Sequence, residues 1–420
     1  MTAAQIIAPT QSREEAQQLI LAQVTRKIVG LFGADLSALI LTGSIARGEG
    51  SLLLKDGKWW VLGDAEFLVV LRDGARLLST RRFSRVAQEM SGVLERLGII
   101  CSLDFSAVHA DYFLRMRPHI FGYELRTCGK TLWGDPEVLH SLPSFSASEI
   151  PKEDAWRLLC NRMIEQLRVL GGIHTEGDLP IEKMMHSCNK FFLDLGTSLL
   201  IFLGEYEPTY QLRAEKLSRL AHDANGSGLP FSLVDFSRQA TKLTAFRLRP
   251  ETDPCIGAAI PSAAAQREAL LRRWLEAVPY ARRLWDWEIA ALVGEGERGA
   301  SLDEQWARFL RAQSPFDKLK GWLHLFSRSE YRFSHTRFKD VLRLIATASP
   351  RYLTYAAASH LYFAAPQLLG PEGGGSLQVP ARAKRLLPIQ RRSRGDSSAW
   401  GDVRQDVVWL YEQFLVRTRH

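Results

Sequence analysis

The first third of the chain alternates between two hydrophobic periods. Apolar residues recur at steps of three and four from Ala16 to Leu31, which predicts an amphipathic helix ending near Gly33. A short apolar strand over residues 37–42 follows and is broken by a Gly-Ser pair. Residues 51–62 predict a hairpin that turns at Asp56-Gly57, because Asp-Gly tolerates the left-handed backbone of such turns.

Two further strands and a helix complete this region. A strand is expected from Ala65 to Leu71, a helix around residues 83–97, and a strand over the apolar run from Ile99 to Val108. Strands that alternate with helices favour an α/β class, a small mixed sheet with helices. From Asp154 onward the pattern changes to successive helices, expected around residues 156–170, 182–203, 264–278, 302–312 and 403–416.

This change divides the chain into three predicted parts. They are an α/β catalytic domain over residues 1–150, a helical domain over 151–260 that completes the cleft, and a C-terminal helical region over 261–420. A flexible loop is expected near 370–400, where Gly, Pro and Ser are frequent.

Composition and charge narrow the class of protein. Of the 420 residues, 46% are hydrophobic and 24% are charged, which is typical of a folded globular protein. The first residues lack the pattern of an export signal, and the five cysteines occur singly, so a cytoplasmic protein away from the membrane is expected. The net charge of +8 is a modest excess, which permits nucleic-acid binding without indicating it.

The pattern places acids and a glycine turn next to the predicted strands. Asp64 and Glu66 lie two positions apart, so a strand directs both carboxylates to one face. Asp104 is the best third carboxylate; within its strand it shares a face with Ser102 and Ser106. Carboxylate oxygens are the ligands that Mg²⁺ prefers, and Mg²⁺ also accepts substrate phosphates. Each acid also has an alternative without a metal. Asp64 and Glu66 would then lie at a solvated strand end, and Asp104 would accept hydrogen bonds from backbone donors inside the sheet.

The Gly43-Ser44 turn offers the second half of the pattern. A glycine allows close approach of the backbone, and the serine hydroxyl with nearby N–H groups can hold a triphosphate. Arg47 follows closely; it either meets phosphate or pairs with Glu49, and both remain open.

Together these segments resemble the signature of the DNA polymerase β nucleotidyltransferase superfamily. The matching stretches are LTGSIARGEGS, GDAEFLVVL and SLDFSAV. The resemblance implies that Gly43 and Ser44 contact triphosphate, that Asp64 and Glu66 bind two Mg²⁺ ions, and that Asp104 binds the catalytic ion and activates the acceptor. The pattern departs from the family in two ways: 19 residues separate Ser44 from Asp64, explained by the hairpin, and Glu66 stands where Asp is common.

A looser similarity concerns the helical part. FGYELRTCGKTLWGD before a helical region is similar to the segment that closes the catalytic domain of aminoglycoside-type nucleotidyltransferases. In template-independent branches a helix behind the site offers a lysine to the triphosphate, which here implies Lys190; its alternative is a surface ion pair with Asp194, four residues on.

The expected function is therefore transfer of a nucleoside monophosphate from a triphosphate, with ATP favoured, to an unidentified acceptor hydroxyl, with a small molecule favoured. The alternative is a non-catalytic protein of the same fold that senses a nucleotide or binds a partner.

Overall fold

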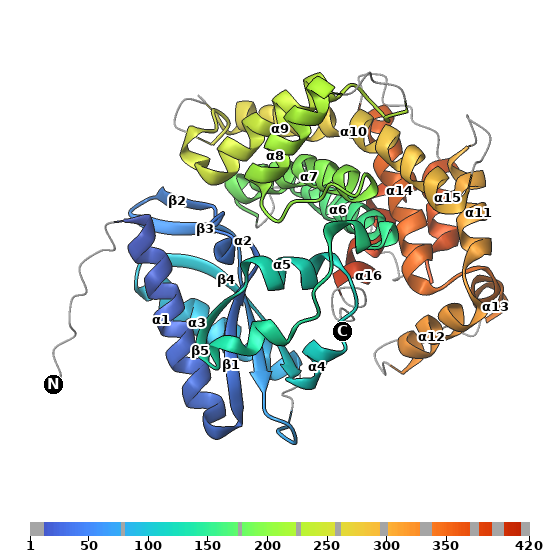
Figure 1. Cartoon of the computed structure of the whole chain (residues 1–420). Coiled ribbons are helices and arrows are strands. Elements are labelled where there is room, and N and C mark those ends of the chain that lie inside the picture. Colours follow the sequence, from blue (N-terminus) through green and yellow to red (C-terminus); the bar gives the residue numbers. More distant parts are fainter. Residues whose placement is uncertain are drawn as a thin grey trace.

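The computed structural model describes residues 12–76, 80–174, 179–223, 228–256, 262–294, 301–327, 338–369, 378–388 and 399–412. An α/β part, blue to teal in Figure 1, packs beneath a larger helical part, green to red. This arrangement agrees with the predicted α/β region followed by helices.

The sheet is mixed, and its longest strand, β3, pairs with β1, β2 and β4. Its strands are β1 (Leu36–Thr42), β2 (Leu52–Lys55), β3 (Lys58–Leu71), β4 (Ile99–His109) and β5 (Lys130–Gly134). β1 is antiparallel to both β3 and β5, whereas β4 lies parallel to β3 on its other side. β2 and the first residues of β3 form the predicted hairpin, and Asp56 and Gly57 adopt the positive φ angles of 52° and 72° that its tight turn requires.

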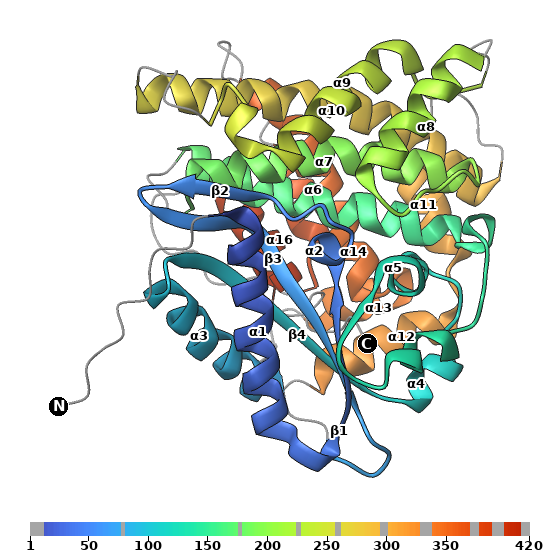
Figure 2. The same cartoon turned by 60° about the vertical axis from the view of Figure 1, so that its left-hand side comes forward.

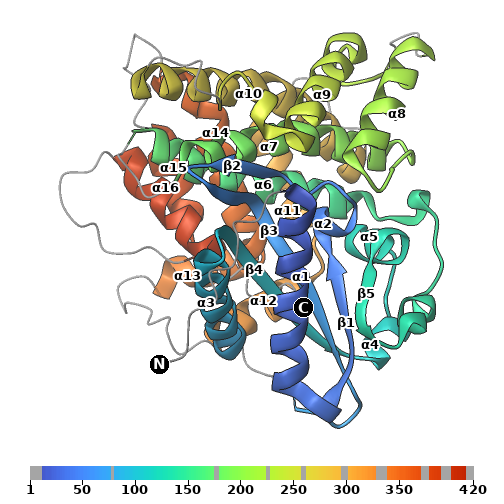
Figure 3. The ribbon, with the colours of Figure 1, turned by 90° about the vertical axis from the view of Figure 1, so that its left-hand side faces the viewer.

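Helices cover the two faces of the sheet. In this part they are α1 (Arg13–Phe32), α2 (Gly43–Ala46), α3 (Thr80–Arg96), α4 (Asp111–Leu114) and α5 (Ile120–Cys128). α1 and α3 share one core with the odd-numbered positions Ala65 and Phe67 of β3. Leu68 and Val70, which point the other way, pack with residues of α4 and α5. Figure 3 shows α1 and α3 running along the sheet on one side and α4 and α5 on the other.

The helical part contains α6 (Lys152–His174), α7 (Ile181–Phe202), α8 (Tyr210–Asp223), α9 (Leu233–Leu248), α10 (Ala263–Val293), α11 (Leu302–Ala312), α12 (Pro315–Phe326), α13 (Phe338–Thr347), α14 (Pro350–Leu369), α15 (Gln378–Leu386) and α16 (Ala399–Leu410). Short 3₁₀ helices cover Gly33–Asp35, Pro136–Ser141, Ala147–Glu149 and Pro250–Thr252. α6 and α7 are nearly surrounded by the others.

One contiguous hydrophobic core unites the helical part. It includes Trp156 on α6, Phe191 on α7, Trp274 on α10 and Tyr362 on α14, and it continues to Val407 on α16. The boundary expected at residue 260 therefore does not separate two cores, because α10 packs directly on α6 and α7.

The loop expected near residues 370–400 contains a helix. α15 occupies its middle, whereas residues 370–377 and 389–398 lie outside the described residues. Ala383 and Leu387, four positions apart, are fully buried in the helical core, so packing stabilises a helix that the Gly- and Ser-rich surroundings concealed.

Among the described helices, none combines the length and the apolar character that crossing a membrane requires.

Candidate active site

The acids predicted from sequence lie on neighbouring strands and on one face of the sheet. Glu66 on β3 is the register partner of Asp104 on β4, and Asp64 is the partner of Ser102. Ala65 and Phe67 pack in the core beneath α1 and α3, and Leu103 and Phe105 pack against it. Because side chains alternate along a strand, the three carboxylates face away from that core.

A glycine makes room for the central carboxylate. Gly43 begins α2 directly after β1 and has a φ of +67°, a conformation that L side chains rarely adopt. A Cβ atom at this position would lie 2.7 Å from both Cδ and Oε1 of Glu66. Thr42, which precedes Gly43, is the register partner of Glu66 across β1 and β3. The Gly43-Ser44 turn and the strand acids therefore form one site, and Ser44 itself is buried.

Asp64 and Glu66 lie in an environment that is unfavourable for negative charge. Desolvation by the surrounding protein raises the pKa of Asp64, and the charges of Asp104 and Glu165 act in the same direction. Desolvation also raises the pKa of Glu66, assisted by Asp64 and Asp104. Lys190 is the main group that opposes both shifts. A cation that entered this site would be attracted by three carboxylates.

Lys190 comes from α7, the helix that lies over the hairpin end of the sheet (Figure 2). Two contacts fix this placement: Lys55 Nζ on β2 lies 2.7 Å from Glu182 Oε1, and a Cβ atom at Gly63 would lie 3.7 Å from His186 Nε2. Lys190 is half-buried on the same helix. It forms no hydrogen bond or ion pair with the residues that the structure describes. Its positive charge is close enough to Asp64 and Glu66 to lower the pKa of both carboxyl groups.

The surface ion pair between Lys190 and Asp194, which was the alternative role for this lysine, does not form in the structure. Asp194 is buried, and its two carboxylate oxygens accept hydrogen bonds from Arg162 Nε at 2.6 Å and Tyr210 Oη at 2.6 Å. It is therefore not the partner of a surface ion pair with Lys190. The charge of Arg162 and desolvation lower the pKa of Lys190, while Glu165 and Asp194 oppose that shift.

Arg47 forms ion pairs with protein carboxylates, including the pair with Glu49 that the sequence analysis gave as one of two possibilities. Its guanidinium is almost buried and donates to Glu49 Oε2 at 3.4 Å and to Glu124 Oε2 at 2.6 Å. Two carboxylates thus occupy its side chain, which favours a structural role for Arg47 over a contact with phosphate.

The sequence did not indicate the network that surrounds Arg47. Glu124 on α5 also accepts from Arg213 Nη2 at 2.7 Å and Tyr206 Oη at 2.6 Å. Burial alone would raise the pKa of Glu124, but the charges of Arg47 and Arg213 outweigh it and hold that pKa below its usual value. These partners are 77 to 89 positions apart, so no local pattern could pair them.

The described residues contain no group of three His, Cys, Asp or Glu side chains close enough to one another to hold a metal ion. The acids of β3 and β4 face one region without forming a closed set of ligands. The histidines have no such set either: His186 is buried and lies 3.1 Å from Arg247 Nη1.

No family model matches the chain, and no curated protein matches it. Among solved structures, a spectinomycin adenyltransferase from Enterococcus faecialis, solved with ATP and spectinomycin, is similar to it at 11% sequence identity and a TM-score of 0.33. That likeness covers 61% of this chain and 99% of the other.

Proposed function

We propose that this chain is a magnesium-dependent nucleotidyltransferase that moves a nucleoside monophosphate from a triphosphate, with ATP favoured, to an acceptor hydroxyl. One observation carries the proposal: the Glu66 carboxylate fills the space that Gly43 leaves open, opposite Asp104 in the sheet. The glycine turn and the acids were predicted to act together, and their contact supports a common role.

In the proposed reaction, the acceptor oxygen attacks the α-phosphorus of the triphosphate. A new P–O bond forms, the bond between the α-phosphorus and the bridging oxygen breaks, and pyrophosphate leaves with that electron pair. Asp104, which is exposed and stands opposite Glu66, accepts the proton of the hydroxyl. Lys190 lies near the acids without a partner among the described side chains and is assigned to the triphosphate.

Magnesium fits the chemistry of these donors. Asp64, Glu66 and Asp104 offer carboxylate oxygens, and desolvation makes the negative charges of Asp64 and Glu66 costly without a counterion. Mg²⁺ commonly takes one or two carboxylates and completes its coordination with waters and substrate phosphates, so a closed set of three protein ligands is not required. When bound, two such ions would neutralise charge on the attacking and leaving oxygens.

The acceptor is assigned to the helical part, and a small molecule is favoured. α7 brings Lys183 and Lys190 to the acids, seven positions apart on one helical face. The acceptor would then bind beside the triphosphate, between the sheet and the helices above it.

A screen tests the proposal directly. The full-length protein is incubated with Mg²⁺, each of four α-labelled nucleoside triphosphates and a library of small hydroxyl compounds, and both pyrophosphate and labelled products are measured. The proposal is supported if wild type forms a labelled product with at least one acceptor and the Asp64→Asn variant does not. Asp111→Asn serves as a matched control, because Asp111 is a partly exposed acid at the start of α4, where it pairs with Arg115. Nucleotide binding without any labelled product would favour the non-catalytic alternative.

A further inference from the structure

Glu288 is a carboxylic acid enclosed at the centre of the helical part. It lies on α10, next to the core residues Trp285 and Ile289, and its exposed fraction is 0%. Neither Oε1 nor Oε2 has a hydrogen-bond partner among the residues that the structure describes. Glutamate is almost never fully buried unless it is paired, so a negative charge at this position would be costly.

Polar side chains from two further helices lie beside Glu288. The Ser198 hydroxyl on α7 is fully buried and close enough to influence the pKa of Glu288, although its oxygen forms no hydrogen bond of ordinary geometry within the described part of the chain. The Cys160 thiol on α6 lies near both Glu288 and Trp285. Desolvation first, and the charge of Glu288 second, raise the pKa of this thiol, so it stays neutral. These neighbours carry no charge that could compensate a carboxylate.

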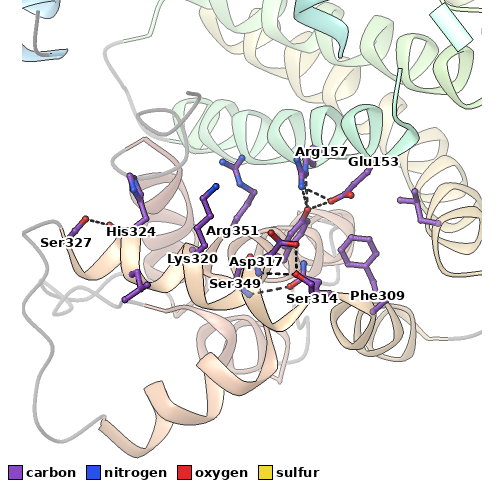
Figure 4. A pocket seen from close by; sticks show the side chains of 16 residues that line it. Glu153, Arg157, Phe309, Ser314, Asp317, Lys320, His324, Ser327, Ser349 and Arg351 are labelled. Atoms are coloured by element: carbon purple, nitrogen blue, oxygen red, sulfur yellow. Dashed lines mark hydrogen bonds and ion pairs between the residues drawn. The ribbon is translucent and has the colours of Figure 1, made fainter. Parts of the chain in front are cut away.

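The charged groups on the helices that pack against α10, which are α6, α7, α11 and α14, are engaged elsewhere. Arg157 on α6, whose charge reaches Cys160, donates to Glu153, and Figure 4 shows these two side chains together. Lys190 on α7 acts on the strand acids. No charged side chain of the described residues lies close enough to Glu288 to shift its pKa. Further pairs on these helices are Asp194 with Arg162, Asp303 with His360, Arg282 with Asp286, and Tyr355 with Asn161.

The surroundings therefore favour the neutral form of Glu288. Desolvation raises its pKa from 4.5 to about 8, and the Ser198 hydroxyl opposes this shift. In the unfolded chain the acid loses its proton near its ordinary pKa of 4.5, whereas in the folded chain it keeps the proton up to about pH 8. The folded state holds one more proton between these values, so the equilibrium constant for unfolding rises with pH across that window.

A pocket of about 970 Å³ comes within about one helical turn of this acid. Arg157, Leu292 and Phe309 are among its lining residues, and Figure 4 shows Arg157 and Phe309 in its wall. Leu292 follows Glu288 by four positions on α10, and Cys160 follows Arg157 by three on α6, so each pair shares a helical face. The pocket gives water a short route toward Glu288 when α10 moves.

We propose that Glu288 is a pH-sensitive latch of the helical part: in its neutral form it lets α10 pack on α6 and α7, and loss of its proton to solvent loosens this packing. An ionised Glu288 would meet only neutral side chains, and it regains hydration if α10 moves until water reaches the carboxylate. Trp285 on α10 packs against Trp156 on α6, with ring centroids 6.3 Å apart, so this movement should change the environment of both rings.

Urea denaturation of the full-length protein between about pH 5 and about pH 9 tests the latch. The unfolding equilibrium constant of wild type, divided by that of Glu288→Gln, should rise about tenfold per pH unit up to about pH 8 and then level off, because one proton is released on unfolding. Glu268→Gln is the matched control: it removes a carboxyl group from the same helix at an exposed position paired with Arg272, so its ratio should stay nearly constant. A constant ratio for Glu288→Gln would overturn the proposal.

A second variant and a second measurement complete the test. Glu288→Leu also removes the carboxyl group and should show the same pH dependence relative to wild type, so the result does not depend on how glutamine packs. Without urea, the near-UV circular dichroism of wild type should weaken around pH 8, whereas Glu288→Gln should keep its signal, because the tryptophan rings stay fixed only while α10 is packed. An unchanged wild-type spectrum between about pH 7 and about pH 9 would mean that ionisation leaves the packing in place, and would overturn the latch.

Discussion

Glu66 and Gly43 are in contact across the β1–β3 pair: the carboxylate occupies the volume in which any other residue at position 43 would place its Cβ atom. The turn that follows β1 and the acid on β3 are therefore coupled by sterics as well as by their proposed chemistry.

Replacement of this glycine should disturb both stability and activity. In Gly43→Ala, the φ of +67° and the 2.7 Å approach to Glu66 should lower the free energy of unfolding by about 1 kcal/mol or more and displace the carboxylate. Gly30→Ala is the matched control, because position 30 lies inside α1 with no atom within 4 Å of its added Cβ. It should raise the free energy of unfolding by up to about 1 kcal/mol, measured by urea denaturation. Equal effects of the two substitutions would contradict the steric argument.

Asp64→Asn should reduce labelled-product formation by at least about a hundredfold, since several kcal/mol of charge stabilisation disappear from the transition state. The substitution removes a negative charge that its surroundings disfavour, so the melting temperature should not fall below that of wild type. The initial rate with saturating ATP and the thermal melt are the two measurements. A rate within a factor of two of wild type would remove Asp64 from the mechanism.

Lys190→Ala should raise the apparent KM for ATP about tenfold with a smaller effect on kcat, because the lost charge-assisted contact is made to the triphosphate before and during transfer. Lys190→Arg should restore part of the affinity by supplying the same charge. Lys242→Ala, at an exposed lysine of α9, should leave both constants unchanged. An unaltered KM in Lys190→Ala would return this lysine to a structural role.

Glu124→Gln should destabilise the protein in a manner that depends on pH. Removing the charge leaves Arg213 without a carboxylate partner and Arg47 with Glu49 alone, at a cost of about 3 kcal/mol near neutral pH. The folded pKa of Glu124 lies below its ordinary value of 4.5, so its stabilising effect is complete above that value and is lost as the pH falls through the lower, folded pKa.

Urea denaturation of wild type and Glu124→Gln at several pH values measures this effect. The difference between them should be largest at neutral pH and shrink below pH 4.5. Glu137→Gln, at an exposed acid paired with His140, should show little difference at any pH. A constant difference for Glu124→Gln across the whole range would mean that its charge is not involved.

The parts of the fold that local chemistry determines could be predicted. The Asp56-Gly57 turn requires two positive φ angles that these residues tolerate, and the alternation around Asp104 determines its face once the segment forms a strand. Both predictions were confirmed. The assignment of metal ions and nucleotide to these residues stays a prediction.

Long-range partners could not be read in the same way. The short spacing between Arg47 and Glu49 suggested that these two residues pair, but no local pattern could identify Glu124, 77 positions away, as a second partner of Arg47. Helical spacing suggested an ion pair between Lys190 and Asp194. In the structure, Asp194 instead accepts hydrogen bonds from Arg162 and Tyr210. α15 was missed because its stability comes from burial against distant helices, which leaves no strong periodicity in a short segment.

Contacts between the sheet and the helices affect the stability that the α/β part would have without the helical part. Arg13 Nη1 donates to the carbonyl of Leu248 at 2.6 Å, and Ser51 Oγ donates to the carbonyl of Arg247 at 2.7 Å. A fragment cut after residue 150 would lack both acceptors, and the Lys55 ion pair with Glu182 would also be lost. The α/β part is therefore expected to be less stable on its own than in the intact chain, by about the contribution of these three contacts.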